Sequence, residues 1–572
     1  MIHDHGDRPY DWVGAWSERR ATLTPDTVGL KDVTTGESYT YADLDERANR
    51  AARLLAERGV EKGDRIAVVS RNRIELVDLF FAAGKLGAVL APLSHRLAPP
   101  ELGELLDRVD PSVLAVEAPF AEDVATALDG DADAVDDSPA EASGDDPLCP
   151  TIRLPAETDA EATTSALDAA PTYADALPAD GSPVDGADVA LSDPALFLHT
   201  GGSTGTPKET VLTHGSICWN SFNTITAWGL RPDDVTPMVF PMFHTGGWNV
   251  LTIPLFHIGG TVVIGREVDP ERVLRTIEDE RASVLVAVPA VLRMMAETDR
   301  WEQTDLSALR FVKSGGGPCR DATIRAWRER GVDLSQGYGL TECGPNNFAM
   351  PEGWPDEKAD TIGKPVLHAD VRIVDESGDP VERGEIGELE LAGPHAADRY
   401  WRDEGETRAT FGTPRSDAEA DGVAASGSDA ENADAAASPS DADSAYGWVS
   451  TGDLARVDED GYYSIEGRKK NMFVSGGENV YPPEIETALT DHPGVDEAVV
   501  IGVPDEQWGT VGKAVVQGDE SLTLDALREF LDGRLAGFKH PRELAFVDEM
   551  PTSGPSKIDR SAIARRFGTD GN

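Results

Sequence analysis

The chain has 572 residues, which is too long for one ordinary hydrophobic core, so we expect more than one domain. Its 103 acidic residues outnumber the 51 basic ones, and the formal net charge is −52. A surface this acidic repels nucleic acids and anionic lipids, which excludes binding to polyanions as the main function.

The acidity has two explanations. One is a surface that binds a basic partner, and the other is adaptation to multimolar salt, in which hydrated carboxylates keep proteins in solution. Acidic residues run along the entire chain and lysine is scarce beside arginine, which favours the second explanation. We therefore predict an extreme halophile as the source. We also predict a loss of structure in dilute buffer, because the Debye length rises from about 3 Å at 1 M salt to about 10 Å at 0.1 M.

No feature of the sequence indicates export or a membrane anchor. The four cysteines are far apart and form no CxxC pair. The first residues lack the basic and apolar regions of a signal peptide, and no stretch approaches the roughly 18 apolar residues of a membrane span. These features predict a protein with reduced cysteines in the cytoplasm, without a membrane span.

The first part of the chain alternates predicted helices and strands. Residues 42–58 place apolar side chains at helical spacing and predict an amphipathic helix. The segments DRIAVVS, IELVDLFFAAGKLG and AVLAPLS then predict strand, helix and strand. This order is typical of a parallel α/β sheet, and residues 112–118 predict a further strand.

Two acidic segments interrupt this pattern. Residues 121–189 and 413–445 are rich in Ala, Asp, Glu and Ser and contain few large apolar side chains. Low hydrophobicity with high net charge does not offset the entropy of ordering the chain. We predict that the second segment is a disordered surface insertion, that the first is partly disordered, and that neither carries chemistry.

Regular structure is predicted again outside these segments. Residues 284–297 predict a strand and a helix, and residues 308–318 predict a strand that ends in a glycine turn. Residues 369–393 alternate apolar and polar side chains between turn pairs, which predicts antiparallel strands. Beyond residue 468 the pattern predicts a small α+β domain.

The strongest local motif is HTGGSTGTPK, from His199 to Lys208. Its glycines allow backbone N–H groups to approach a phosphate, its hydroxyls add donors and its lysine adds positive charge. The motif lacks the spacing of a Walker P-loop, and Pro207 precedes the lysine. Taken alone, the segment is equally compatible with a flexible turn.

Further motifs follow in a fixed order. They are SGGGP at 314–318, QGYGLTECGP at 336–345, STGDLARVDEDGYYSIEGRKKNMFVSGGENVYPPEIE at 450–486 and PTSGPSKIDR at 551–560. Together with the first motif they resemble the adenylate-forming enzymes, the superfamily of acyl-CoA synthetases, firefly luciferase and the adenylation domains of peptide synthetases. The resemblance covers nearly the whole chain apart from the two acidic segments.

The resemblance implies an α/β fold in two domains. Residues 1–466 would form a large N-terminal domain of parallel α/β subdomains plus a β subdomain, and residues 467–572 a small mobile α+β domain. The implied enzyme is an ATP-dependent acid–CoA ligase. It adenylates a carboxylic acid with release of pyrophosphate, then transfers the acyl group to CoA with release of AMP, and it uses ATP, Mg²⁺ and CoA.

The resemblance also implies roles for single residues. Thr341 would bind the α-phosphate, Glu342 would hold Mg²⁺, and Lys557 would stabilise negative charge as the carboxylate attacks phosphorus. Tyr338 would stack on adenine, and Asp453 would accept both ribose hydroxyls with Arg468 nearby. The residues implied to bind nucleotide or CoA, or to act as the hinge, are Thr200, Gly201, Gly202, Ser203, Thr204, Gly205, Lys208, Gly315, Gly316, Gly317, Pro318, Tyr338, Gly339, Asp453, Arg468, Lys470, Ser475, Gly476, Gly477 and Glu478. Lys470 would be the hinge about which the small domain rotates to bring residues 475–479 to the CoA tunnel.

Two residues depart from the family pattern. Ser556 precedes Lys557 where the family usually has glycine, and this affects the placement of that lysine. Glu209 replaces a glycine after the phosphate-loop lysine and adds an acid beside a phosphate site. We expect adenylation to tolerate both changes.

The segment FPMFHTGGWNVLTIPLFHIGG is expected to border the acyl group. His244 lies where peptide-synthetase domains use an Asp for the substrate ammonium group, so a free amino acid is not expected. Trp248 and the apolar run after it predict an apolar pocket, and His244 would gate or line the acyl channel unless it is a packed histidine. The motifs look most like those of medium- to long-chain acyl-CoA synthetases, with an aryl acid as the alternative.

Two other functions remain open at this point. An acyl-AMP ligase would load a carrier protein instead of CoA, and a catalytically impaired scaffold would use the fold for binding alone. The small-molecule partner expected in either ligase is a carboxylic acid. The sequence leaves the oligomeric state open, a homodimer included.

Overall fold

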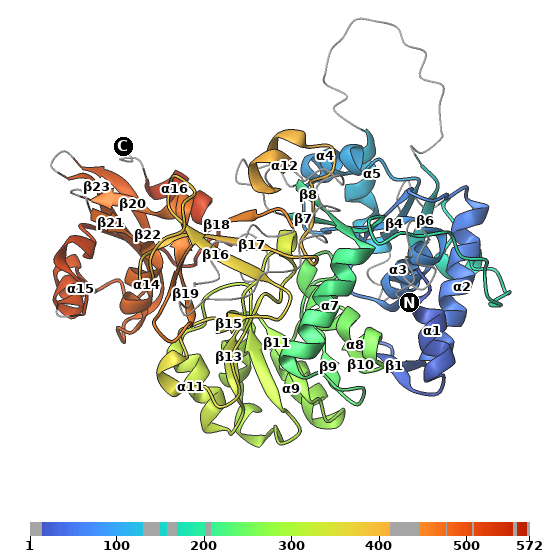
Figure 1. The fold of residues 1–572 in the computed structure, drawn as a ribbon, viewed down its shortest axis with the longest axis horizontal. Coiled ribbons are helices and arrows are strands. Elements are labelled where there is room, and N and C mark those ends of the chain that lie inside the picture. Colours follow the sequence, from blue (N-terminus) through green and yellow to red (C-terminus); the bar gives the residue numbers. More distant parts are fainter. Residues whose placement is uncertain are drawn as a thin grey trace, which may run out of the picture.

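The computed structural model describes residues 14–129, 149–156, 169–200, 208–411, 446–475, 478–505, 508–532, 534–552 and 558–568. Figure 1 shows the chain from the N-terminal α/β layers, in blue and green, to the C-terminal elements, in red, at one end of the molecule. No helix in these ranges is long and apolar enough to cross a membrane.

The first layer is a six-stranded sheet with the strand order β6-β5-β3-β4-β7-β8. Its strands are β3 (Arg65–Val69), β4 (Val89–Leu93), β5 (Val113–Glu117), β6 (Thr151–Leu154), β7 (Pro194–Thr200) and β8 (Lys208–Thr213). Strands β3 to β7 are parallel, and β8 alone runs antiparallel to its neighbour. The apolar runs in β3 and β5 are buried on both faces, as expected for a covered parallel sheet. The predicted parallel α/β sheet is therefore confirmed.

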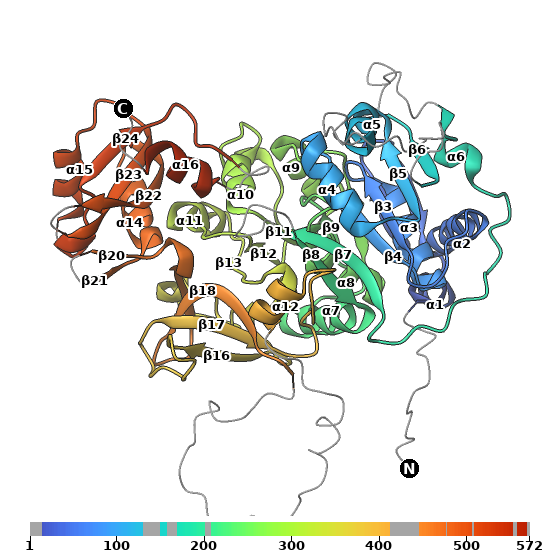
Figure 2. The same cartoon turned by 90° about the horizontal axis from the view of Figure 1, so that it is seen from above.

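Helices cover this sheet (Figure 2). They are α2 (Tyr41–Glu57), α3 (Ile74–Leu86), α4 (Pro99–Val109), α5 (Ala121–Asp129), α6 (Tyr173–Ala176) and α7 (His214–Trp228). Helix α2 begins with a capping box in which the Thr40 hydroxyl accepts from the Asp43 N–H, and the Asp43 carboxylate accepts from the Thr40 N–H. Helix α3 ends at Gly87, whose φ of 67° favours glycine.

The first acidic segment is more ordered than its composition predicts. Helix α5 and strand β6 both come from residues 121–189, and Val124 and Ile152 are 0% exposed. The low average hydrophobicity of the segment does not reveal these two short apolar stretches. Burial of their apolar side chains against the sheet is favourable. Residues 130–148 and 157–168, and the second acidic segment, lie outside the described residues.

Two further sheets complete the α/β part. One has the order β2-β1-β10-β9 and consists of β1 (Val28–Asp32), β2 (Glu37–Thr40), β9 (Val235–Pro237) and β10 (Thr261–Ile264). The other is parallel and consists of β11 (Val284–Ala287), β12 (Phe311–Ser314) and β13 (Leu334–Gln336). The helical elements that pack with them are α1 (Trp16–Leu23), η4 (Gly246–Val250), α8 (Thr252–Ile258), α9 (Pro270–Asp279), α10 (Pro289–Ala296) and α11 (Asp321–Glu329).

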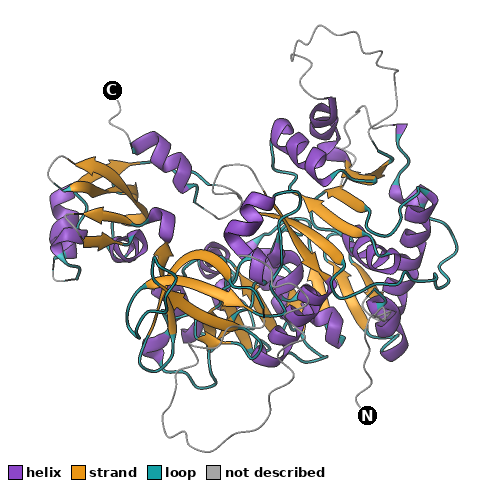
Figure 3. Cartoon of the chain, turned by 45° about the horizontal axis from the view of Figure 1, so that its top comes forward, coloured by secondary structure: helices purple, strands orange, loops and turns teal. Residues whose placement is uncertain are grey.

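An antiparallel sheet and a small C-terminal unit follow (Figure 3). The sheet consists of β16 (Asp370–Val374), β17 (Gly387–Ala392), β18 (Val449–Val457) and β19 (Tyr463–Arg468), with α12 (Glu404–Phe411) between β17 and β18. The C-terminal unit contains β20 (Phe473–Ser475), β21 (Glu478–Val480), α14 (Pro482–Thr490), β22 (Val495–Asp505), β23 (Gly509–Gly518), α15 (Leu524–Leu531), β24 (Glu543–Phe546) and α16 (Arg560–Phe567). The antiparallel strands and the small α+β unit are confirmed, whereas the boundary at residue 466 stays a prediction.

Candidate active site

Strands β7 and β8 bring the two ends of the predicted phosphate loop together. They pair antiparallel, with Thr200 opposite Lys208. Five predicted residues of the loop between them lie outside the described part of the chain: Gly201, Gly202, Ser203, Thr204 and Gly205. Lys208 is 8% exposed, and its ammonium group forms an ion pair with the carboxylate of Glu406 on α12. The hairpin therefore holds a paired lysine at the end of a glycine-rich loop.

Tyr400 connects this lysine to the predicted magnesium ligand. The Lys208 Nζ lies 5.4 Å from the centre of the Tyr400 ring, and the Tyr400 hydroxyl donates to Glu342 Oε1 at 2.7 Å. Burial and the charge of Glu342 hold the pKa of Tyr400 well above its usual range, so its hydroxyl stays a donor. Glu342 belongs to the short helix η6 (Thr341–Cys343), whose carbonyl at Glu342 accepts from the Ala397 N–H at 2.7 Å.

Sequence reasoning missed Tyr400 and Glu406. Both lie in the segment ADRYWRDEGETRATF, between the antiparallel sheet and the second acidic segment. The only available signal was a pair of adjacent aromatic residues in polar surroundings, which is typical of many surface turns. The spatial contact with β8 depends on the fold and carries no local pattern.

Tyr338, Asp453 and Arg468 meet at a second cluster. The Tyr338 hydroxyl donates to Asp453 Oδ2 at 2.6 Å, and Arg468 Nε donates to Asp453 Oδ1 at 2.7 Å. Asp453 and Arg468 face each other in the β18–β19 register, which explains why the sequence places them fifteen residues apart. The predicted proximity of Arg468 to Asp453 is therefore confirmed. Whether Tyr338 stacks on a base stays a prediction, since its ring packs edge-on against Phe348, 5.7 Å away.

The two nearby motifs contain glycine for different structural reasons. A Cβ at Gly339 would lie 2.2 Å from the Pro345 carbonyl carbon, so that turn requires glycine. In the SGGGP loop, Gly316 has a φ of 86°, whereas a Cβ at Gly317 would meet nothing within 4 Å. Gly316 to Pro318 are exposed. The loop therefore offers open backbone after β12, which is the kind of surface on which a flat ring can lie.

The predicted hinge and CoA segment lie where the antiparallel sheet ends. Lys470 is in the short helix η10 (Lys469–Asn471), directly after β19, and Ser475 ends β20 with 4% exposure. Ser475 lies opposite Glu478 in the β20–β21 ladder. Three predicted residues of the C-terminal part lie outside the described residues: Gly476, Gly477 and Lys557.

One polar contact joins the C-terminal unit to the residues directly after the SGGGP loop. Arg320, two residues past Pro318, donates from Nη2 to the Asp496 carbonyl at 2.7 Å. The same guanidinium lies 2.9 Å from Glu497 Oε1, and both side chains are about one-third exposed. In the present arrangement this contact lies between the C-terminal unit and a residue that follows the SGGGP loop.

The predicted acyl segment is partly exposed and partly buried in the core. His244 is exposed, and its ring lies 4.5 Å from that of Phe243. The prediction for Trp248 is wrong: it is 0% exposed, its indole donates to the Met242 carbonyl at 2.6 Å, and its ring packs against Phe80. A large aromatic side chain with a satisfied N–H gains more free energy in the core than at a pocket surface.

A cluster of buried amide side chains lies between α7, η4 and the loop after β13. Asn220, Asn223, Asn249 and Asn346 are each at most 3% exposed. The Asn220 amide donates to the Asn249 carbonyl at 2.7 Å, and Asn346 Nδ2 donates to the Val250 carbonyl at 3.2 Å. Among the described residues, Asn220 Oδ1, Asn223 Nδ2 and Asn249 Oδ1 have no hydrogen-bond partner. Sequence reasoning missed this cluster, because single Asn residues in helices form no motif.

The amide cluster lies directly behind the QGYGLTECGP motif. A Cβ at Gly344 would lie 2.5 Å from Asn220 Oδ1, so this glycine allows close approach of the motif to α7. Asn347, which follows the cluster, donates from Nδ2 to the Gly344 carbonyl at 2.7 Å. Unpaired buried polar atoms cost about 1–3 kcal/mol each, so a cluster of three requires a reason.

Two buried titratable groups flank the phosphate hairpin. Burial raises the pKa of Glu209 to about 7, although the Arg108 guanidinium, 3.3 Å from Oε2, opposes the shift. Burial and the charge of His244 lower the pKa of His199 to about 3, so His199 is neutral. Glu209, which stands where the family usually has glycine, therefore adds a carboxyl group with a pKa near neutrality beside Lys208.

The residues present fit the groups that the motifs imply. Open glycine backbone, the Asp453 carboxylate and the Lys208 ammonium suit a nucleotide with its base, ribose and phosphates. One carboxylate, Glu342, suits Mg²⁺, which keeps several waters and is commonly bound through phosphates and only one or two protein ligands.

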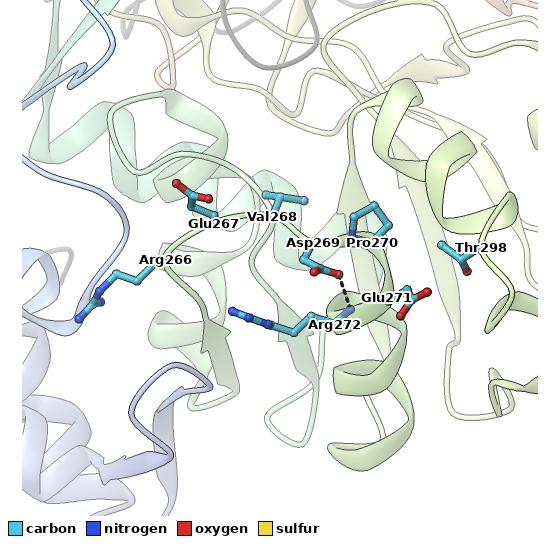
Figure 4. A pocket seen from close by; sticks show the side chains of 8 residues that line it. All are labelled: Arg266, Glu267, Val268, Asp269, Pro270, Glu271, Arg272 and Thr298. Atoms are coloured by element: carbon cyan, nitrogen blue, oxygen red, sulfur yellow. Dashed lines mark hydrogen bonds between the residues drawn. The ribbon is translucent and has the colours of Figure 1, made fainter. Parts of the chain in front are cut away.

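A separate cavity of about 440 Å³ lies at the start of α9 (Figure 4). Residues 266–272 and Thr298 line it, and the Asp269 carboxylate accepts from the Arg272 N–H at 2.9 Å. None of these lining residues belongs to a motif. The cavity is therefore a surface recess beside a helix cap and not the predicted site.

Comparison with known proteins agrees with this geometry. The AMP-binding enzyme family model matches residues 17–401, and the model of the AMP-binding enzyme C-terminal domain matches residues 484–557. The chain is 35% identical to a feruloyl-CoA synthase of Amycolatopsis, covering 97% of this chain and 99% of the relative. It is 33% identical to an indoleacetate–CoA ligase of Aromatoleum aromaticum, covering 96% and 97%.

A solved structure shows the same fold. ATP-bound MatB from Rhodopseudomonas palustris superposes with a TM-score of 0.79 at 27% identity, covering 97% of this chain and 99% of that protein. Adenylate-forming CoA ligases of this type use ATP, Mg²⁺ and CoA. On the matching motifs, two-domain fold and full-length relatives, the chain belongs to the AMP-binding enzyme family.

Proposed function

We propose that this chain, an AMP-forming acid–CoA ligase, activates an aromatic carboxylic acid that carries a polar substituent on its ring. In the first half-reaction a carboxylate oxygen attacks the α-phosphorus of ATP, and pyrophosphate leaves with the bonding electron pair. In the second, the sulfur of CoA attacks the acyl carbon and AMP leaves. Such displacements depend on positioning and electrostatic stabilisation more than on a protein nucleophile.

Each of the charged residues described above would bind a different part of the nucleotide. Lys208 would balance the charge of the outer phosphates, and Asp453 would accept the ribose hydroxyls with Arg468 holding its carboxylate. Glu342 would hold Mg²⁺, which when bound neutralises phosphate charge. Thr341 would bind the α-phosphate, and Lys557 would stabilise the charge that develops there.

The amide cluster carries the proposal about the acid. We propose that the acid, held with its carboxylate near Thr341, extends past Gly344 towards α7, where Asn220 Oδ1 and Asn223 Nδ2 have no partner among the described residues. An alkyl chain would leave these atoms without partners, whereas a ring hydroxyl or carbonyl would pair with them. The geometry therefore favours a substituted aromatic acid over the medium- or long-chain fatty acid suggested by the motifs.

The names of the two relatives support this choice, because ferulate and indoleacetate are both aromatic acids with a hydrogen-bonding group. The cytoplasmic location and the adaptation to multimolar salt are further parts of the proposal. The adaptation to multimolar salt is supported by the net charge of −52 and is tested by circular dichroism between 0.1 M and multimolar KCl.

The experiment is AMP release from MgATP, with and without CoA, in KCl at which the protein is folded. The acids are 4-hydroxycinnamate, indoleacetate and dodecanoate. We expect CoA-dependent AMP release that is fastest with the aromatic acids. A preference for dodecanoate would overturn the substrate class, and pyrophosphate release without any response to CoA would favour the carrier-protein ligase. Folded protein that releases no AMP with any acid would favour the scaffold.

A further inference from the structure

We propose that Glu406 is the counter-ion of Lys208 in the nucleotide-free enzyme and that the phosphates of ATP displace it. This inference rests on the proposed role of Lys208 in binding ATP. It assigns Glu406 as a positioning residue that competes with the nucleotide for one ammonium group.

The burial of Lys208 requires a counter-ion. Its side chain is 9% exposed, and an ammonium group removed from water is costly unless an opposite charge and hydrogen bonds replace the solvent. The Glu406 carboxylate supplies that charge through Oε2. A phosphate oxygen supplies the same charge with a similar geometry, so the two ligands compete for Lys208.

The backbone around Glu406 is fixed before any ligand arrives. The Glu406 N–H donates to Asp403 Oδ1 at 3.0 Å, and the Thr407 hydroxyl donates to the Asp403 carbonyl at 2.6 Å. The Thr407 oxygen also accepts from the Tyr400 N–H at 3.0 Å. These hydrogen bonds cap the first turn of α12 and orient Glu406 towards the β7–β8 hairpin.

The segment before α12 is tied to the same strand as Lys208. The Val211 N–H donates to the Arg399 carbonyl at 3.1 Å, and the Trp401 N–H donates to the Glu209 carbonyl at 2.8 Å. The backbone that carries Glu406 therefore cannot move away without breaking contacts with β8. Displacement is confined to the Glu406 side chain, which is 33% exposed and has solvent into which it can rotate.

A neighbouring acid provides a matched control. Glu404 is on the same turn of α12, but its side chain is 92% exposed and its nearest basic group, Arg408, is 3.8 Å away. Glu404→Gln removes one negative charge from the same helix without touching Lys208. A difference between the two variants would then be due to the loss of the Lys208–Glu406 ion pair and not to the change in net charge.

The test is MgATP binding by calorimetry in the absence of an acid, together with thermal unfolding with and without MgATP. We expect Glu406→Gln to bind MgATP about fivefold or more tightly than wild type, because Lys208 no longer exchanges one anion for another. The empty variant should melt below wild type, and saturating MgATP should remove that difference. Glu404→Gln should match wild type in both measurements.

The outcomes separate the two proposals. Wild type that binds no MgATP would overturn both the nucleotide site and this inference. Wild type that binds MgATP, with equal affinity in Glu406→Gln and Glu404→Gln, would overturn the inference alone, as would weaker binding in Glu406→Gln. In a Lys208→Met background the effect of Glu406→Gln should shrink to that of Glu404→Gln, and an undiminished effect would contradict competition for the lysine.

Discussion

The nucleotide side and the acyl side of the site are built in opposite ways. On the side proposed to bind the nucleotide, charged groups are paired with one another, as in Lys208–Glu406 and Asp453–Arg468. On the acyl side, neutral amides are buried with atoms that have no partner among the described residues. Under these proposals, the common chemistry would depend on exchanging one charge partner for another, whereas substrate selection would depend on buried polar atoms that only a suitable acid can pair.

The largest expected effect is on the nucleotide side. Asp453→Asn removes the charge that holds Arg468 and one acceptor for the Tyr338 hydroxyl, so we expect kcat/KM for ATP to fall about 100-fold. The factor should be the same for every acid. Pyrophosphate release measures it, with Asp458→Asn, an acid just past β18 that pairs with Lys358, as a control within about twofold of wild type. A loss that depends on the acid would break the division between the two sides.

The next effect is selective. Asn223→Leu removes the unpaired Nδ2 donor on α7, together with the Oδ1 atom that lies 2.7 Å from His368 Nδ1, so the ratio of kcat/KM for 4-hydroxycinnamate over cinnamate should fall about tenfold or more. The control is Thr226→Ala, an exposed position on the same helix. If the variant slows both acids equally, Asn223 stabilises the fold and does not select the substrate.

A pH effect is expected from Glu209, which is 1% exposed. Burial raises its pKa from 4.5 to about 7, so the folded state holds a proton that the unfolded state has lost between these values. The free energy of unfolding should therefore decrease as pH rises from about 4.5 to 7. This shift corresponds to roughly 3 kcal/mol at most.

Glu209→Gln should remove that dependence. Because Arg108 then loses its partner, we expect a net gain of only about 1 kcal/mol at pH 8, and the gain should disappear towards pH 5. Urea unfolding at a series of pH values measures the difference between variant and wild type. A variant that stays less stable than wild type at pH 8 would show that the Arg108 contact outweighs the cost of burying the carboxylate.

The smallest effect concerns the contact with the C-terminal unit. Arg320→Ala removes an ion pair with Glu497 in which each side chain is about one-third exposed, and such pairs contribute at most about 1 kcal/mol. We expect a change of about twofold in the KM for CoA, identical for all acids. A tenfold change, or one that differs between acids, would mean that this contact controls the site and does not merely border it.

The sequence predicted those parts of the molecule that repeat a local pattern. The strand–helix–strand order of β3, α3 and β4 predicted a parallel sheet, and the cross-strand neighbours Asp453 and Arg468 were found through one continuous motif. The ordered stretches α5 and β6 were underestimated, because composition averages over the acidic residues around them.

The missed residues depend on contacts between distant segments. Glu406 reaches Lys208 across 198 positions, and Asn346 reaches Asn249 across 97. Neither pair is marked by a characteristic spacing in the sequence. The first forms only where β8 lies against α12, and the second only where the loop after β13 lies against η4. Trp248 was misplaced for the related reason that an apolar run fits a core as well as a pocket.

The most direct test of the account is a pair of acids that differ by one hydroxyl group. The kcat/KM values for 4-hydroxycinnamate and cinnamate are compared by AMP release at fixed MgATP and CoA, in KCl that keeps the protein folded. We expect a preference of about tenfold or more for the hydroxylated acid, because its hydroxyl would pair with the amide cluster. Equal values, or a preference for cinnamate, would contradict it.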